Sequence, residues 1–324
     1  MSGRVLLGVD IGGTKVAAGL VDETGNILSK VRVPMIAESS ADIAIDCVYR
    51  AIEKALQSSQ VTAQAIGISS PGPLDPRTGV ILQTPNLPCW RNFPLLEHVQ
   101  KRYGIRTKVE NDANAAGLAE ALWGAGKNFK SVFYATFGTG VGTAIVQEGT
   151  IYHGRTGLAA EGGHMTIDIN APVRCGCGKR GCFESMVSGP AIAFHTRERL
   201  SLDGAQTVLK ELQEDQLTAE GIINAWESRD SLATEIMKGV LELLAVWLGN
   251  IIDLLEPEVM VIGGGLGARL SAWLPEISAR IPGCTINTRA AEIPLVAAHY
   301  GADSGIAGAA ALFTVDEAVS PVGN

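Results

Sequence analysis

The feature that most constrains the fold is a stretch of sequence that occurs twice. The first copy is GVDIGGTKVAAGLVDETGNIL from Gly8, and the second is YATFGTGVGTAIVQEGTIY from Tyr134. Each has an apolar run of strand length, a glycine turn, a second such run, a tight turn and a third run, which predicts a β-hairpin followed by another strand. A repeated unit of this kind predicts that each half of the chain has its own hairpin.

The length and composition of the chain agree with two halves. Its 324 residues, of which 46% are hydrophobic and 19% charged, exceed what one compact core usually covers. We therefore expect two domains with a cleft between them and, since no low-complexity linker separates them, a hinge. The N-terminal domain is expected over residues 1–112 plus about 303–324, and the C-terminal domain over 113–302.

Apolar periodicity and turn residues predict the individual elements. Strands are expected over Arg4 to Val9, Val16 to Val21, Ile27 to Val33, Ala65 to Ser69, Thr107 to Glu110, Val132 to Thr136, Thr143 to Val146 and Val259 to Ile262. Helices are expected from Asp42 onward, and over Ala113 to Trp123, Ala233 to Leu255 and Ser304 to Leu312. Ser39, three residues before Asp42, resembles the first residue of a capping box.

The charge and hydropathy of the chain exclude several classes of partner. A net charge of −8, with no local run of Lys and Arg, disfavours binding to nucleic acid or to an anionic membrane surface. No stretch of membrane-spanning length is apolar throughout, and Val5 to Val9 is too short for the apolar core of a signal peptide. A cytoplasmic protein is expected.

The glycine turns are candidate phosphate cradles. Successive free amides at a strand end bind phosphate oxygens, and two facing turns can hold a triphosphate, although a single glycine turn is more often a plain hairpin. Asp10, before the first turn, is a candidate to hold Mg²⁺ through water, or else a turn aspartate that accepts nearby amides. DIGGTK lacks the G-x-G-x-x-G spacing and precedes a strand, which argues against a dinucleotide fingerprint.

The sequence Glu110, Asn111, Asp112 lies where a predicted strand runs into a predicted helix. A carboxylate placed there could accept the proton of an alcohol that attacks phosphorus. The alternative for Asp112 is a simple helix cap.

His164 and three closely spaced cysteines predict a metal site. Cys175, Cys177 and Cys182 lie within CGCGKRGC, whereas Cys47, Cys89 and Cys284 are scattered along the chain. Three thiolates and one imidazole satisfy tetrahedral zinc, and a full ligand set predicts a structural site.

Two glutamates lie beside these metal-binding residues in the sequence. Glu161 and Glu184 could accept hydrogen bonds from sugar hydroxyls, although either alone would be read as a surface charge. The other histidines, His98, His153, His195 and His299, are taken as surface or satisfied core residues. Trp90 either closes the edge of a sugar site or covers a loop.

Taken in order, DIGGTK, ENDANAA, FGTGVGTAIV, HGRTGLAAEGGH and CGCGKRGCFES resemble the ROK family of repressors, open reading frames and kinases, and most of all its bacterial glucokinase branch. The resemblance runs from Gly8 to about Ala310. It implies an actin-like ATPase (ribonuclease H-like) fold with two α/β domains. It also implies transfer of the γ-phosphate of ATP, with Mg²⁺, to the 6-hydroxyl of glucose.

The resemblance also implies roles for single residues. Asp112 would be the general base, and the sugar would lie near Gly72, Asn86, Asn111, Asp112, Glu161, His164 and Glu184. The nucleotide would lie near Asp10, Gly12, Gly13, Thr14, Lys15, Gly138, Thr139, Gly140 and Gly264. His164 would bind zinc through one ring nitrogen and contact the sugar through the other. Relatives are usually dimers or tetramers.

Several alternatives stay open at this point. N-acetylmannosamine or N-acetylglucosamine could replace glucose, and polyphosphate could replace ATP. A sugar-responsive repressor of the same family would carry an N-terminal helix-turn-helix, whereas the first strand here is expected at about Arg4. A zinc-containing sugar-binding protein without catalysis is disfavoured by Asp112 and the duplicated hairpins.

Overall fold

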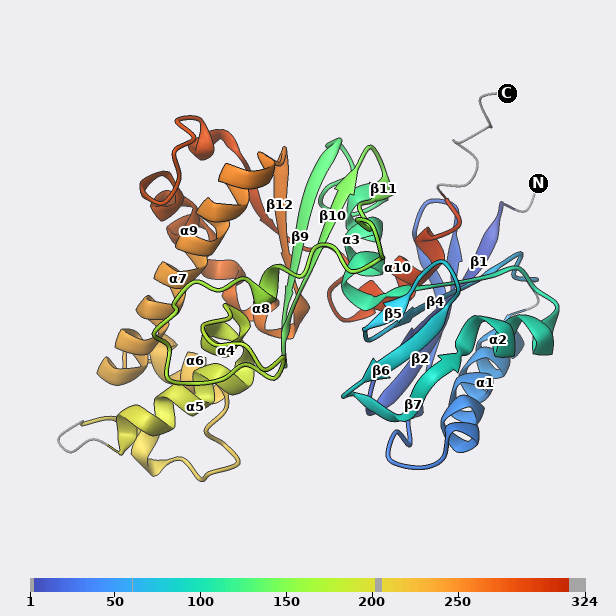
Figure 1. Ribbon diagram of the computed structural model, residues 1–324, viewed down its shortest axis with the longest axis horizontal. Helices are drawn as coiled ribbons and strands as arrows, with labels where there is room; N and C mark the ends of the chain where they lie inside the picture. Colours follow the sequence, from blue (N-terminus) through green and yellow to red (C-terminus); the bar gives the residue numbers. More distant parts are fainter. Residues whose placement is uncertain (1–2, 60, 202–205, 315–324) are drawn as a thin grey trace. The chain divides into compact units, whose positions relative to one another are not determined.

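The computed structural model of the chain describes residues 3–59, 61–201 and 206–314. Contacts divide the chain into two compact units: unit 1 runs to Lys130 and includes Ala144–Ala160 and the residues from Ala302, and unit 2 comprises Ser131–Thr143 and Glu161–Gly301 (Figure 1). This division keeps residues 113–130 and 144–160 with the N-terminal strands, whereas we expected the boundary after residue 112. Where the functional domains divide stays a prediction, and residues 315–324 of the expected N-terminal domain lie outside the described residues.

Unit 1 is built on a sheet in the order β3-β2-β1-β4-β8, in which β1, β2 and β3 are antiparallel and β1, β4 and β8 are parallel. Its strands are β1 (Val5–Ile11), β2 (Lys15–Asp22), β3 (Ile27–Pro34), β4 (Ile66–Ser70) and β8 (Thr107–Asn111). Its helices are α1 (Ala41–Gln57), α2 (Leu95–Tyr103), α3 (Asp112–Leu122) and α10 (Ser304–Ala311). A second sheet, which the sequence analysis did not predict, contains β5 (Leu74–Asp75), β6 (Val80–Thr84) and β7 (Leu87–Pro94).

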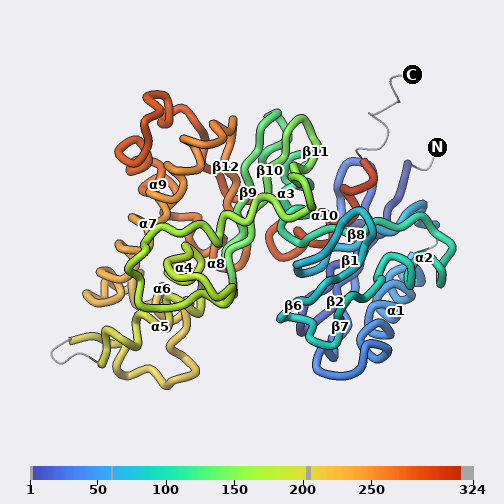
Figure 2. Tube along the Cα trace, in the orientation of Figure 1, coloured from blue at the N-terminus to red at the C-terminus, as the bar shows by residue number. Residues whose placement is uncertain are grey.

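The two faces of the first sheet pack against different helices. Because side chains alternate along a strand, Leu7 and Val9 of β1 lie on the face whose core includes α1. Figure 2 shows α1 alongside this sheet. The next residue along the other face is Gly8, which lies beside Gly67 of β4 in the parallel register. A Cβ atom on either glycine would overlap backbone atoms of α10, so the glycines let this alanine-rich helix lie directly on the sheet.

The start of α1 corrects one prediction. Its N-cap is Ser40, whose hydroxyl accepts a hydrogen bond from the Ile43 amide (3.4 Å), and not Ser39. The Ser39 hydroxyl donates instead to the carbonyl of Ile36 (2.8 Å). Either serine fits the sequence pattern, and the turn that precedes the helix decides which of them caps it.

The other five-stranded sheet has the order β11-β10-β9-β12-β13. The boundary between unit 1 and unit 2 falls within its strand β10. The strands are β9 (Ser131–Phe137), β10 (Val141–Gln147), β11 (Thr150–Ile151), β12 (Val259–Gly263) and β13 (Leu295–Ala297). β10 and β11 are antiparallel, and β9, β12 and β13 are parallel. This repeats the arrangement of the first sheet, as the duplicated sequence predicts.

The helices of unit 2 are α4 (Glu184–Val187), α5 (Gly189–Leu200), α6 (Ala219–Glu227), α7 (Ser231–Leu255), α8 (Gly264–Leu270) and α9 (Leu274–Arg280). Short 3₁₀ helices lie at Gly162–His164, Val208–Glu211, Ser271–Trp273, Ile281–Gly283, Ala290–Glu292 and Gly301–Asp303. Trp247 of α7 is buried, stacks on Phe183 (ring centroids 4.3 Å apart) and donates its indole N–H to the carbonyl of Gly162 (3.0 Å). This contact anchors the 3₁₀ helix that carries His164. Among the described helices, none combines the length and apolar content needed to cross a membrane.

Candidate active site and metal centre

The junction of β8 and α3 presents Asp112 to solvent. Asn111 is the N-cap of α3, and its Oδ1 accepts hydrogen bonds from the amides of Ala113 (3.0 Å) and Asn114 (3.2 Å). Asp112 is the first helical residue, and its exposed carboxylate accepts the Ala113 amide (2.8 Å). The N-cap position that we considered for Asp112 is therefore occupied by Asn111. An exposed carboxylate at this end of α3 is compatible with a role as a base.

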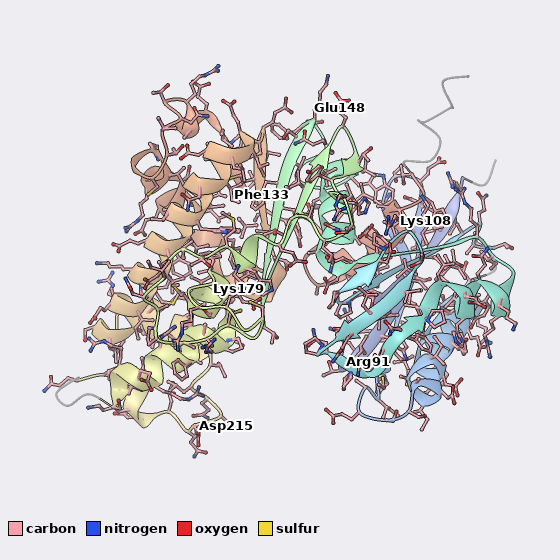
Figure 3. All side chains as sticks on the ribbon, in the orientation of Figure 1. Arg91, Lys108, Phe133, Glu148, Lys179 and Asp215 are labelled. Carbon is pink, nitrogen blue, oxygen red and sulfur yellow. The ribbon has the colours of Figure 1, made fainter. Side chains whose placement is uncertain are left out.

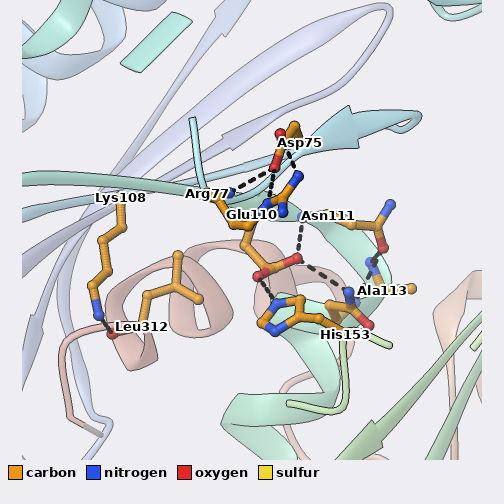
Figure 4. Close-up of polar contacts among 9 residues, drawn as sticks. Asp75, Arg77, Lys108, Glu110, Asn111, Ala113, His153 and Leu312 are labelled. Carbon is orange, nitrogen blue, oxygen red and sulfur yellow. Dashed lines mark hydrogen bonds and ion pairs between the residues drawn. The ribbon is translucent and has the colours of Figure 1, made fainter. Parts of the chain in front are cut away.

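A buried carboxylate lies directly behind this junction (Figure 4). Glu110 is 4% exposed, and its Oε1 accepts the Asn111 amide (2.9 Å) and the Asn114 side-chain amide (3.1 Å). Its Oε2 lies 2.6 Å from Nε2 of His153, and this hydrogen bond raises the pKa of the imidazole. Sequence reasoning took His153 as a surface or satisfied core residue and missed the pair, because the partners are separated by 43 positions and fit no spacing rule.

Gly72 lies next to Asn111 in unit 1. A Cβ atom on Gly72 would lie 3.2 Å from the Asn111 side-chain nitrogen, so the structure brings these two predicted sugar-site residues together. Asn86 lies instead beside the first glycine turn, where its carbonyl would be 2.8 Å from a Cβ on Gly13.

The first glycine turn links β1 to β2. It contains Gly12, Gly13, Thr14 and Lys15, and the Gly12 amide donates to the Lys15 carbonyl (2.9 Å). Asp10, at the end of β1, accepts a hydrogen bond from the Ser69 hydroxyl (2.9 Å), and burial raises the pKa of its carboxyl. A nearby cation would favour its ionised form, so the residue suits the predicted Mg²⁺ role.

A cavity of about 840 Å³ opens in unit 2 beside the second glycine turn. Its lining comes from that turn, from α5 and α8, and from α6 with the two residues before it: Gly138, Thr139, Gly189, Pro190, Ala193, Arg197, Leu217, Thr218, Ala219, Glu220, Ile223, Gly265, Leu266 and Arg269. This volume and the mixture of apolar and charged lining are typical of a cofactor site. We predicted Gly138 and Thr139 for the nucleotide, whereas the α5 and α6 residues were missed. The Ser188-Gly189-Pro190 helix start was the signal available for α5.

Gly264 and Gly265, which follow β12 at the third glycine-rich strand end, have different roles. Gly264 has a φ of 81° and lies so close to β9 that a Cβ atom would overlap the Phe137 carbonyl. The neighbouring Gly265 lines the cavity. Gly264 therefore makes the turn that brings Gly265 to this surface.

The four predicted metal ligands lie together in unit 2. One donor atom from each of His164, Cys175, Cys177 and Cys182 lies within 4.8 Å of the others. Sγ of Cys175 is 3.6 Å from Nδ1 of His164, and Sγ of Cys177 is 3.6 Å from that of Cys182. Tetrahedral zinc with Zn–S of about 2.3 Å requires sulfurs about 3.8 Å apart, so the donor set fits the ion.

The loop around this cluster is held by its own polar contacts. Lys179, labelled in Figure 3, donates to the carbonyl of His164 (2.7 Å). Burial raises the pKa of Cys175 to about 12 and also raises that of Cys182. A bound cation would oppose this effect by stabilising the thiolates.

Glu184 connects the cysteine cluster to the second glycine turn. Its Oε2 accepts the Val141 amide (2.8 Å), while Oε1 lies 3.5 Å from Sγ of Cys175 and 4.0 Å from Nδ1 of His164. Gly140 lies against the same carboxylate. The other predicted acid, Glu161, immediately precedes the Gly162–His164 helix, and desolvation raises the pKa of its carboxyl although it keeps contact with solvent.

Trp90 takes neither of the positions considered for it. It is fully buried in the core of unit 1, stacks on Phe93 (ring centroids 4.7 Å apart) and donates its indole N–H to the carbonyl of Ala41 (3.4 Å). Trp90 belongs to β7, which pairs with β6 in a hairpin that the sequence did not predict.

Comparison with known sequences places these features in a wider set of proteins. The chain is 34% identical to a glucokinase of Thermotoga maritima over 95% of this chain and 96% of that protein. It is 31% identical to an N-acetyl-D-glucosamine kinase of Pasteurella multocida over 94% of this chain and 98% of that protein.

Solved structures give the same result for the fold. A ROK family glucokinase from Streptomyces griseus, in complex with glucose and AMPPNP, superposes with a TM-score of 0.81 at 32% identity, covering 95% of this chain and 98% of that chain. A ROK family transcriptional regulator, a homologue of the E. coli MLC protein, superposes with a TM-score of 0.85 at 26% identity over 96% of this chain and 78% of the regulator. The two repeated α/β sheets and these likenesses confirm the predicted actin-like ATPase fold.

The description of the matching family model is "ROK family", and it matches residues 6–315. This match spans both units and all the motifs that the sequence analysis singled out. The chain belongs to the ROK family.

Proposed function

We propose that the protein is an ATP-dependent sugar kinase that transfers the γ-phosphate of ATP to the 6-hydroxyl of glucose. The observation that carries the proposal is the exposed Asp112 carboxylate beside Asn111 and Gly72, in a chain similar over nearly its whole length to glucokinases. Phosphoryl transfer needs alignment, charge stabilisation and a proton acceptor rather than a covalent intermediate.

In the proposed reaction, Asp112 accepts the proton of the 6-hydroxyl as the sugar oxygen forms a bond to the γ-phosphorus. The bond between that phosphorus and the β–γ bridging oxygen breaks, and ADP leaves. Asn111 and Gly72 would place the sugar near Asp112, with Asn86, Glu161, His164 and Glu184 as further sugar contacts. Because Asn111 caps α3, its side chain is held in a fixed direction, which favours a positioning role.

The nucleotide would use residues of both glycine turns. The cavity in unit 2 has room for a nucleoside, and Arg197, Glu220 and Arg269 add charged groups to its wall. The amides of Gly138–Gly140 and of Gly12–Lys15 would hold phosphate oxygens, and Asp10 would hold Mg²⁺. Magnesium would supply charge neutralisation for the transferring phosphate.

The Cys₃His site would hold a structural zinc ion. His164 faces the cysteines through Nδ1, which leaves Nε2 for a hydroxyl of the sugar. Bound zinc would cross-link the loop. It would offer no open coordination position to a substrate, since four protein donors fill its coordination sphere. Glu184 accepts a hydrogen bond from the Val141 amide, so it would hold the second glycine turn in place against this loop.

Two alternative functions have support of their own. An N-acetyl-D-glucosamine kinase is 31% identical over most of this chain, so an amino sugar is the second candidate substrate. The likeness to a transcriptional regulator supports a sugar-responsive protein without catalysis.

A panel of sugars and donors tests the proposal. The substrates would be glucose, mannose, N-acetylglucosamine and N-acetylmannosamine, each tested with ATP and with polyphosphate. ADP release would report turnover with ATP, and detection of the phosphate ester would report turnover with polyphosphate. The proposal expects the highest kcat/KM for glucose with ATP. A higher value for an amino sugar would favour the second candidate, and sugar binding without turnover for any member would favour a regulator.

A further inference from the structure

Glu110 links three polar groups at one place in unit 1. Its carboxylate accepts the Asn111 amide and the Asn114 side-chain amide through Oε1 and contacts His153 through Oε2 (Figure 4). A carboxylate that is 4% exposed needs such partners, because an unpaired buried charge is strongly destabilising. The orientation of the Asn111 peptide therefore depends on the position of Glu110, and the position of Glu110 depends on its partners.

His153 also fixes the loop to which it belongs. Its carbonyl accepts the amides of Gly157 (3.1 Å) and Ala159 (3.3 Å), so its backbone closes the segment 153–160. The chain continues from this segment directly into Glu161. His153 thus connects the start of the loop before Glu161 to the turn that carries Asn111 and Asp112.

We propose that His153 is a positioning residue for phosphoryl transfer, because its ion pair with Glu110 holds the Asn111–Asp112 turn in its productive conformation. This inference rests on the proposed function. His153 does not contact the reacting atoms in this account; it acts through Glu110 and the Asn111 amide. A misplacement of about 1 Å at a reacting group can cost roughly 100-fold in rate, so a positioning residue can have a large effect.

Cations and acids both lie around the His153–Glu110 pair. A cavity of about 550 Å³ is lined by His153 and Glu110 and by three cations, Arg77, Lys108 and Arg155. Arg77 is paired with Asp75 (3.0 and 3.1 Å), and Lys108 donates to the carbonyl of Leu312 (2.8 Å). The acids of α3 are Asp112 at its start and Glu120, buried further along. The hydrogen bond to Glu110 and the charge of Glu110 raise the pKa of His153 and outweigh burial, which lowers it.

The proposal has a consequence for the pH profile. His153 is 37% exposed at its side chain and lines the cavity, so it can exchange protons with solvent. Below its pKa, the imidazolium makes a charge-assisted hydrogen bond to Glu110; above it, the charge is lost and the pair weakens. The value of kcat should therefore decline on the alkaline side as His153 deprotonates.

Three variants test the role by steady-state kinetics between pH 6 and pH 9. His153→Ala should lower kcat roughly 10- to 100-fold while changing the KM for ATP little. His153→Lys keeps a positive charge across this range, so it should restore most of the lost kcat and remove the alkaline decline. The matched control is His98→Gln, another histidine of unit 1, which stacks on Phe93 and should behave as wild type.

A second measurement does not depend on turnover. The chain has five histidines, so their ring protons can be followed individually in an NMR titration. The pKa of His153 should lie above its ordinary value in the wild type and should fall in Glu110→Gln. An unchanged pKa in that variant would overturn the pair itself, whether or not the enzyme is active.

The outcomes separate this inference from the proposed function. Absence of sugar phosphorylation by the wild type would contradict the proposed function alone, and the titration would still judge the pair. With an active wild type, a His153→Ala variant with unchanged kcat and pH profile would overturn the positioning role. So would a His153→Lys variant that keeps the wild-type alkaline decline. A purely structural residue would lower the melting temperature but leave the pH profile of the folded enzyme unchanged.

Discussion

At the residue scale, the fold gives opposite environments to two acids that are two positions apart. Glu110 is the penultimate residue of β8 and is buried with three polar partners, whereas Asp112 begins α3 and is exposed. The strand-to-helix junction is what separates them, because the residue between them, Asn111, ends β8 and caps α3. One acid can then hold the backbone while the other remains accessible to a substrate.

Replacing Asp112 tests its role as the base. Asp112→Asn keeps the size and polarity of the side chain but cannot accept a proton, so kcat should fall about 10²- to 10⁴-fold. The Kd for the sugar, measured by calorimetry, should change little. Phosphorylation at a near-normal rate in this variant would exclude Asp112 as the base.

The His153–Glu110 pair should also make stability depend on pH. The folded-state pKa of His153 is raised, so its contribution is fully present below the unfolded-state pKa of about 6.5 and is lost as the pH rises through the folded value. Melting temperatures of the wild type and His153→Gln should therefore differ more at pH 6 than at pH 9. A constant difference across this range would contradict the ion pair.

The site residues that belong to short sequence motifs could mostly be predicted. The Asn111–Asp112 junction, the cysteine cluster and the glycine turns are each recognisable within a few positions. The Glu110–His153 pair and the cations Arg197 and Arg269 of the cavity were not found, because their partners come from distant segments. No local spacing rule describes such contacts.

At the scale of single elements, α10 depends on glycine in the strands beneath it. Gly67→Ala would place a methyl group against the Ala309 carbonyl, and either the helix or the strand would have to move. We expect a loss of about 1–3 kcal/mol in the free energy of unfolding, measured by chemical denaturation. The control is Gly239→Ala, in α7 with open space around it, which should be neutral or stabilise by about 1 kcal/mol. Equal effects of the two substitutions would contradict this packing.

The Cys₃His cluster should act as a cross-link for the loop that carries it. Purified protein should contain about one zinc ion per chain by mass spectrometry, and Cys177→Ser should lose it together with part of its thermal stability. Cys284→Ser, outside the cluster, should keep the metal. Active protein without zinc would contradict the structural role.

Some elements could not be predicted for physical reasons that the structure makes clear. The strands β5 and β6 are short and β7 contains proline, so their pattern is weak until they pair with one another. Trp90 belongs to this sheet, which explains why its burial was missed. The cap of α1 was displaced by one residue because two serines in succession both satisfy the cap rule.

At the scale of the whole molecule, the two sheets repeat one topology. The orders β3-β2-β1-β4-β8 and β11-β10-β9-β12-β13 each begin with an antiparallel hairpin and end with two parallel strands. The glycine turns proposed to hold phosphate lie between β1 and β2 and between β9 and β10. The duplicated sequence therefore predicted the repeated hairpins, whereas the position of the domain boundary, the cytoplasmic location and a dimeric or tetrameric state stay predictions.

The oligomeric state is open to a direct measurement. Sedimentation velocity at micromolar concentration should give a dimer or tetramer of the 34.0 kDa chain. A single species of monomer mass over this range would contradict that prediction and leave the rest of the account unchanged.

The central claim is that the chain moves a phosphoryl group from ATP to a sugar hydroxyl. The most direct test is ³¹P NMR of a mixture of the protein, Mg²⁺, ATP and glucose. The account predicts a phosphate monoester on the 6-oxygen of glucose that grows in step with ADP. Inorganic phosphate appearing in place of the ester, or a spectrum of ATP that does not change, would contradict it.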